Sequence, residues 1–170
     1  MTILPPAIRA GLLLLVLSTS LAAAAATTAP SAASTRELAA LSSAERRALL
    51  QAAGMKEQKA KGQKEQWLNG CGHPVEPELN LVDLNGDGFP EVFISDDDAC
   101  YGGVGAMLTL MIRDRSGRWR VNLGFPASGY RVLRTAQHGY PDIEIEGPGA
   151  CYPVWRFNGR EYDIFKRCRR

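Results

Sequence analysis

The chain has 170 residues, with 20 Lys and Arg against 18 Asp and Glu, and its formal net charge is +2 at pH 7. This length suits one domain, and the near balance of charge does not indicate a nucleic-acid partner, whose binding face needs a clear excess of Lys and Arg. The only long apolar run lies at the extreme N-terminus. We therefore expect no membrane span in the mature protein.

The N-terminal residues 1–26 predict a signal peptide. Arg9 supplies the positive charge, residues 11–17 form a short apolar stretch, and residues 22–26 are all Ala. This order is typical of an exported protein, with cleavage near Ala26. An uncleaved anchor is the alternative, but the apolar stretch is short for a bilayer span. We expect a periplasmic or secreted protein.

Two segments precede the predicted β domain. Residues 27–41 are rich in Ala, Ser, Thr and Pro and predict a flexible leader. In the helical and polar segment 42–70, Ser42 followed by Glu45 has the form of a capping box before an apolar stripe, which predicts a short amphipathic helix. The Lys- and Gln-rich residues 55–67 predict either a second helix or a solvated extension.

The remaining segment, 71–170, has the pattern of antiparallel β structure. Apolar residues fall on alternate positions in several short runs, which are separated by turn dipeptides such as Asn158-Gly159. We expect seven or eight strands. The run 107–112 lacks this alternation and predicts a strand that is buried on both faces.

The β domain contains an internal repeat. Residues 88–101 align with residues 139–152 at a constant offset of 51, and six of the fourteen positions are identical. The identities include a Pro and a Cys-Tyr pair, which a chance match of two strands would not bring along. The predicted fold is mainly β, with two repeated antiparallel units in a sandwich or partial-propeller arrangement and a short N-terminal helical segment.

The four cysteines, Cys71, Cys100, Cys151 and Cys168, predict two disulfides in an exported protein. A zinc site is the alternative, but the Cys separations of 29, 51 and 17 residues contain no short ligand spacing. Because Cys100 and Cys151 are equivalent in the repeat, and the other two bracket the domain, we expect the pairs Cys100–Cys151 and Cys71–Cys168.

The segment 83–91 carries the clearest chemical signal. It places oxygen-bearing side chains at positions 1, 3, 5 and 9 and a Gly at position 6. Ca²⁺ prefers six to eight oxygen ligands, and Mg²⁺ demands a more rigid octahedron. The predicted ligands are Asp83, Asn85, Asp87, the Phe89 carbonyl and Glu91. The alternative is a turn with incidental acids, since Asn, Asp and Gly are favoured turn residues.

This segment resembles the calcium loop of the FG-GAP repeats of integrin α-subunit propellers and related bacterial exported proteins. The segment departs from an EF-hand, because position 12 is Ile94, where an EF-hand has a bidentate Glu, and the flanks predict strands. The resemblance implies one Ca²⁺ held between two strands by the five ligands named above. Residues 134–138 of the second unit lack these ligands, so one ion per chain is expected. A looser resemblance, through Cys100-Tyr101-Gly102 and residues 147–154, is to small exported proteobacterial proteins.

No common catalytic motif occurs in the sequence, and we do not expect an enzyme. The function predicted is an exported, calcium-stabilised binding module of the bacterial cell envelope, whose partner is an envelope protein. The alternative is an inhibitor or immunity protein against a cell-wall hydrolase, and a periplasmic hydrolase ranks below both. Candidate partner contacts are Tyr101, Gly102 and Tyr152.

Overall fold

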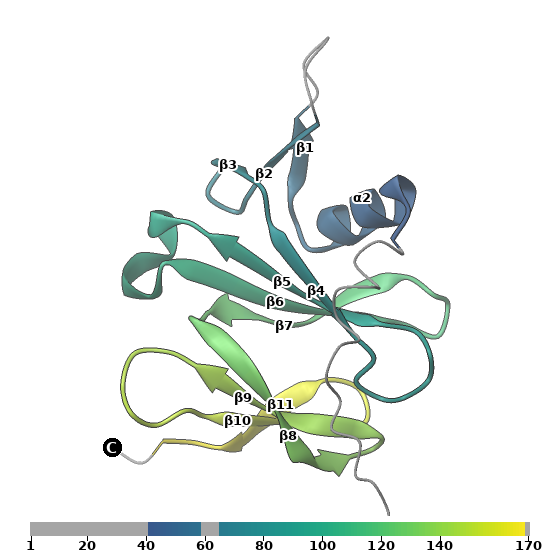
Figure 1. Cartoon of the computed structure of the whole chain (residues 1–170), viewed down its shortest axis with the longest axis vertical. Coiled ribbons are helices and arrows are strands. Elements are labelled where there is room, and N and C mark those ends of the chain that lie inside the picture. Colours follow the sequence, from purple (N-terminus) through teal and green to yellow (C-terminus); the bar gives the residue numbers. More distant parts are fainter. Residues whose placement is uncertain (1–40, 59–64, 169–170) are drawn as a thin grey trace, which may run out of the picture. The chain divides into compact units, whose positions relative to one another are not determined.

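The computed structural model describes residues 41–58 and 65–168 (Figure 1). These residues belong to one unit of the chain, Ser31–Arg170. The predicted signal peptide, 1–26, and the predicted leader up to residue 40 lie outside the described residues. Within the described ranges, no helix has the length and apolar character needed to cross a membrane.

The predicted N-terminal helix is present as α2 (Ser43–Ala52), and the capping box that predicts it is formed. The Ser42 side chain accepts a hydrogen bond from the Glu45 backbone N–H (3.2 Å), and the Glu45 carboxylate accepts one from the Ser42 N–H (3.1 Å). The apolar stripe ends in Leu49 and Leu50, which are fully buried. The helix is therefore held at its start by local hydrogen bonds and along one face by packing.

A small antiparallel sheet follows, made of β1 (Lys56–Gln58), β2 (Gln66–Leu68) and β3 (Pro74–Val75). Of the two alternatives for residues 55–67, the described parts form neither a second helix nor a solvated extension. Trp67 provides the reason, because it is 3% exposed and packs in one cluster with Leu49 and Leu50. Burial of this large side chain outweighs the modest helix propensity of the Lys and Gln residues around it.

Two four-stranded antiparallel sheets form the rest of the described chain. The first sheet runs in the order β4-β5-β6-β7 and the second in the order β11-β10-β9-β8. The first comprises β4 (Glu78–Val82), β5 (Glu91–Asp97), β6 (Ala106–Arg113) and β7 (Trp119–Pro126). The second comprises β8 (Gly129–Gln137), β9 (Tyr140–Glu146), β10 (Val154–Phe157) and β11 (Tyr162–Lys166).

These two sheets confirm the predicted pair of repeated β units. Each sheet is a meander of four sequential strands, and the two aligned segments of the repeat supply its second strand, β5 in the first sheet and β9 in the second. The short 3₁₀ segment η1 (Ala99–Val104) lies between β5 and β6.

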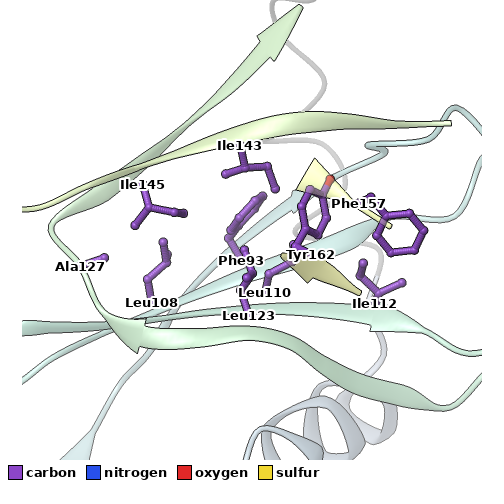
Figure 2. Close-up of a cluster of buried hydrophobic side chains, with 10 residues drawn as sticks. All are labelled: Phe93, Leu108, Leu110, Ile112, Leu123, Ala127, Ile143, Ile145, Phe157 and Tyr162. Carbon is purple, nitrogen blue, oxygen red and sulfur yellow. The ribbon is translucent and has the colours of Figure 1, made fainter. Parts of the chain in front are cut away.

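The main hydrophobic core is built from both sheets (Figure 2). Phe93, Leu108 and Leu110 come from the first sheet, and Ile143 and Phe157 from the second. Neighbouring side chains of β5 and β6 instead pack with α2 and Trp67, as Val92 and Met111 do. Strands β5 and β6 are thus buried on both faces, as the run 107–112 predicts.

The disulfide pairing predicted from the repeat is wrong. The bonds are Cys71–Cys100, which joins the β2–β3 connection of the small sheet to η1 of the first unit, and Cys151–Cys168, which lies within the second unit. Positions that are equivalent in a repeat belong to different sheets, and equivalence does not make them neighbours. Because β11 pairs with β10, with Val154 opposite Lys166, the end of the chain returns beside the connection that carries Cys151.

A candidate metal centre in the loop between β4 and β5

The loop 83–91 connects β4 to β5, and Asp83 shapes its turn. One oxygen of the Asp83 carboxylate accepts a hydrogen bond from the Gly86 N–H (2.7 Å), and the other accepts one from the Gly88 N–H (3.0 Å). Both glycines have positive φ, 75° at Gly86 and 85° at Gly88. A residue with a Cβ would be strained in either place, so the sequence Asn-Gly-Asp-Gly is needed for this bend.

The next two polar side chains of the loop also face its backbone. Asn85 Oδ1 accepts a hydrogen bond from the Asp87 N–H (2.9 Å), and Asp87 Oδ1 accepts one from the Phe89 N–H (2.8 Å). Asn85 Nδ2 donates to Asp87 Oδ2 (2.9 Å). Phe89 follows at the outer end of the loop, where 66% of it is exposed.

Glu91 is the buried acid of the loop, with 3% of its surface exposed. Its carboxylate accepts hydrogen bonds from the Leu84 N–H (2.8 Å) and from the Tyr140 hydroxyl (3.2 Å). Burial raises the pKa of Glu91 to about 7, and the negative charges of Asp87 and Asp83 act in the same direction, against the two hydrogen bonds. A carboxylate in this environment gains stability from a cation beside it.

Three acidic side chains of this loop, those of Asp83, Asp87 and Glu91, have no ion pair with any residue that the structure describes. Their donors are all oxygen, which suits a hard cation such as Ca²⁺. In the described conformation their carboxylate oxygens do not gather within 4.8 Å of one another. A bound cation would therefore draw the three side chains closer together.

The second unit differs from the first at the position equivalent to Glu91, because its buried acid is paired with a basic side chain. Asp142 aligns with Glu91 in the repeat and is 1% exposed. Arg156 on β10 pairs with it through two hydrogen bonds, of 2.8 Å from Nε and 2.6 Å from Nη2, and this pair lowers the pKa of Asp142. In the first unit, the register pairs Val92 with Met111, and the same register continued by one residue sets the apolar Ile112 opposite Glu91. The buried acid of the second unit thus has a cationic partner, and that of the first has none among the residues that the structure describes.

Tyr140 connects the loop to the second sheet. Its hydroxyl accepts a hydrogen bond from Asn85 Nδ2 (2.9 Å) and donates one to Glu91. Its ring packs on Phe157, with 4.3 Å between ring centroids. Burial, with the charge of Glu91, raises the pKa of Tyr140 to about 12, so the hydroxyl keeps its proton. No sequence pattern singles out Tyr140 as part of the site, although the repeat aligns it with Phe89.

The predicted partner contacts lie in two separate connections. Tyr101 is in η1, and its hydroxyl donates a hydrogen bond to Asp96 (2.5 Å), which is 2% exposed. Gly102 is exposed beside it, and Tyr152 is half-buried in the connection between β9 and β10. No ring contact joins Tyr101 to Tyr152 among the described residues.

A second group of possible metal ligands is absent from the sequence analysis. A ring nitrogen of His73, a carboxylate oxygen of Asp98 and the sulfur of Cys100 all lie within 4.8 Å of one another. The sequence signal was the pair of short spacings Cys71-x-His73 and Asp98-x-Cys100, which a count of cysteine separations alone does not detect. In the described state, Cys100 is bonded to Cys71 and has no thiolate to offer.

The chain was also compared with known proteins. No family model, curated protein or solved structure matches it.

Proposed function

We propose that the protein is an exported binding module of the cell envelope, in which the loop 83–91 binds one Ca²⁺. The observation that carries this proposal is the contrast between two equivalent buried acids. Asp142 has Arg156 as its partner, whereas Glu91 has no basic partner among the described residues. Burying a carboxylate without a counter-charge is costly, and a cation in the loop supplies that charge.

The ligand set favours calcium over other common metals. Asp83, Asn85, Asp87, Glu91 and the Phe89 carbonyl offer oxygen only, and neither His nor Cys occurs in the loop. Zinc prefers nitrogen and sulfur ligands in a tetrahedron, and magnesium retains much of its water. Calcium accepts irregular sets of oxygen ligands at variable angles, which suits a loop whose carboxylates must move to reach one ion.

The contacts of the loop indicate what the ion does. Through Asn85 and Glu91, the loop hydrogen-bonds to Tyr140 of the second sheet. An ion held by the same residues stabilises this contact between the two β units and holds the exposed ring of Phe89 in a fixed orientation. We expect Phe89 to contact an envelope protein, because a large exposed aromatic side chain on a rigid loop is typical of a recognition surface. The two disulfides support an oxidising compartment.

The test is the thermal midpoint of the purified protein in chelator and in excess Ca²⁺. Because Ca²⁺ binds the folded state, the midpoint should rise with its concentration. The double variant Asp83→Ala, Asp87→Ala should abolish the rise. Asp97→Ala is the matched control, since Asp97 is an exposed acid at the end of β5, outside the loop. An equal rise in the loop variant and the wild type would contradict the proposal.

The binding role has a separate test. The protein is immobilised and exposed to an envelope extract, with Ca²⁺ or with chelator. A partner should be retained by the wild type in Ca²⁺ and be lost by Phe89→Ala, whose exposed ring contributes little to folding. Equal retention of the partner by the wild type and by Phe89→Ala would contradict the role of Phe89. It would not contradict the calcium site.

A further inference from the structure

Two short segments of the chain bring four potential metal ligands together, away from the loop 83–91. Cys71 and His73 lie in the connection between β2 and β3, and Asp98 and Cys100 lie at the start of η1. The two cysteines form a disulfide, and His73 Nδ1 lies 2.8 Å from Asp98 Oδ2. The four side chains therefore form two adjacent pairs, the Cys71–Cys100 disulfide and the His73–Asp98 pair.

A buried side chain holds both segments in place. Asn69 is 3% exposed, and its Oδ1 accepts hydrogen bonds from the backbone N–H groups of Cys71 and His73, both at 3.0 Å. Its Nδ2 donates to Asp98 Oδ2 (2.9 Å). The other oxygen of Asp98 accepts a hydrogen bond from the Cys100 N–H (2.9 Å). Ligands held by an outer shell of this kind need little rearrangement to bind a metal.

The group is also open to ions from solution. The side chain of His73 is 58% exposed, and Cys71 and Cys100 are both exposed. Asp98 is more enclosed, with 15% of its side chain exposed.

We propose that reduction of the Cys71–Cys100 disulfide converts this group into a zinc site with Cys71, His73, Asp98 and Cys100 as ligands. Two thiolates, an imidazole and a carboxylate make a four-coordinate set of the kind that Zn²⁺ prefers. In the oxidised protein the two sulfurs are bonded to each other, and His73 and Asp98 pair instead. The disulfide and the zinc site therefore exclude one another, so the group acts as a redox switch.

The chemistry balances as follows. A dithiol donor gives two electrons and two protons to the Cys71–Cys100 bond and becomes a disulfide itself, which leaves two thiols on the protein. Zn²⁺ then binds the two sulfurs as thiolates, and their two protons pass to solvent. The ion takes the place of the hydrogen bond between His73 and Asp98.

The experiment measures zinc retained by the protein after gel filtration. Cys151→Ser, Cys168→Ser is the parent variant, because it leaves Cys71–Cys100 as the only disulfide. A phosphine reductant is used, since it becomes the phosphine oxide and does not bind zinc as a dithiol would. We expect one Zn²⁺ per chain after reduction and none before it. Circular dichroism in each state reports whether the chain is folded.

Ligand variants are made in the same parent. His73→Ala and Asp98→Asn should each weaken zinc binding at least about tenfold. Cys71→Ser with Cys100→Ser should abolish it. Asp83→Ala with Asp87→Ala should leave it unchanged, so failure of the calcium proposal and failure of this one are distinguishable.

Three results would overturn the proposal. The first is a reduced parent that retains no zinc, and the second is unchanged affinity in both the His73→Ala and Asp98→Asn variants. The third applies if reduction unfolds the chain: zinc should then restore the folded spectrum, and a chain that stays unfolded in zinc contradicts the site.

Discussion

The Tyr140 hydroxyl of the second sheet donates a hydrogen bond to the buried Glu91 carboxylate of the first sheet, with 3.2 Å between the two oxygens. The two residues are 49 positions apart in the chain. This contact makes the loop 83–91 part of the junction between the β units, because the ring of Tyr140 also packs on Phe157 in the core. A cation bound by the loop therefore affects the stability of both units.

Tyr140→Phe removes this link while keeping the ring. It takes a hydrogen-bond donor from Glu91 and an acceptor from Asn85, so we expect the free energy of unfolding to fall by about 1–2 kcal/mol. Urea denaturation in chelator measures the loss. Tyr152→Phe serves as the control, because Tyr152 is half-buried and its hydroxyl makes no hydrogen bond with any residue that the structure describes. Equal stabilities of the two variants would contradict the assigned role of Tyr140.

Glu91→Gln should stabilise the protein in chelator at about pH 8. The folded pKa of Glu91, about 7, is above the ordinary value of 4.5, so its contribution to stability is complete below pH 4.5 and is lost as the pH rises through 7. A neutral amide avoids this loss. The gain over the wild type should be on the order of 2 kcal/mol at pH 8 and be near zero at about pH 4.

In Ca²⁺ the same variant should have the opposite effect. The wild type should gain stability from the ion, and Glu91→Gln should lose a charged ligand and with it most of that gain. The comparison is made by urea denaturation at about pH 8. If Glu91→Gln were less stable than the wild type in chelator as well, a general packing defect would explain the variant, and the ligand role would fail.

Asp142→Asn should be strongly destabilising. Asp142 is 1% exposed, and the substitution leaves the Arg156 guanidinium without its anionic partner, so we expect a loss of about 3 kcal/mol. The lowered pKa of Asp142 means that this stabilisation is present above the unfolded value of 3.8 and is lost as the pH falls below it. Denaturation midpoints of wild type and variant should therefore converge in acid. A constant difference down to about pH 2 would contradict this assignment.

The disulfides give a prediction about chain entropy. They close loops with sequence separations of 29 for Cys71–Cys100 and 17 for Cys151–Cys168. In the chain-entropy model, removing either one by a double Cys→Ser change costs about 3 kcal/mol. Peptide mapping without reduction should recover both linked pairs, and a peptide that joins Cys100 to Cys151 would contradict the structure.

Much of the fold was predictable because its signals are local. The capping box at Ser42 and the alternation along the strands each depend on neighbours in sequence. The repeat is also visible in the sequence itself, by comparison of residues 88–101 with residues 139–152. The β1–β2 hairpin was not predictable, because its Lys and Gln residues favour a helix and the burial of Trp67 decides against it.

The candidate site was predictable only in part, for the same reason. The bend of the loop follows from Asn-Gly-Asp-Gly, and the glycine conformations agree with it. The contacts of the loop with Tyr140 involve a residue about 50 positions away in the chain. The absence of a basic partner for Glu91 among the described residues depends on which side chains the other strands place near it, and no local pattern reports either feature. The disulfide pairing failed because the repeat identifies equivalent residues such as Cys100 and Cys151, and equivalence carries no information about distance.

The most direct test of the calcium site is equilibrium dialysis of the purified protein against radioactive Ca²⁺, with the Asp83→Ala, Asp87→Ala variant dialysed beside it. The account predicts saturation at one ion per wild-type chain and no saturable binding to the variant. Wild-type protein that retains no more Ca²⁺ than the variant would contradict it.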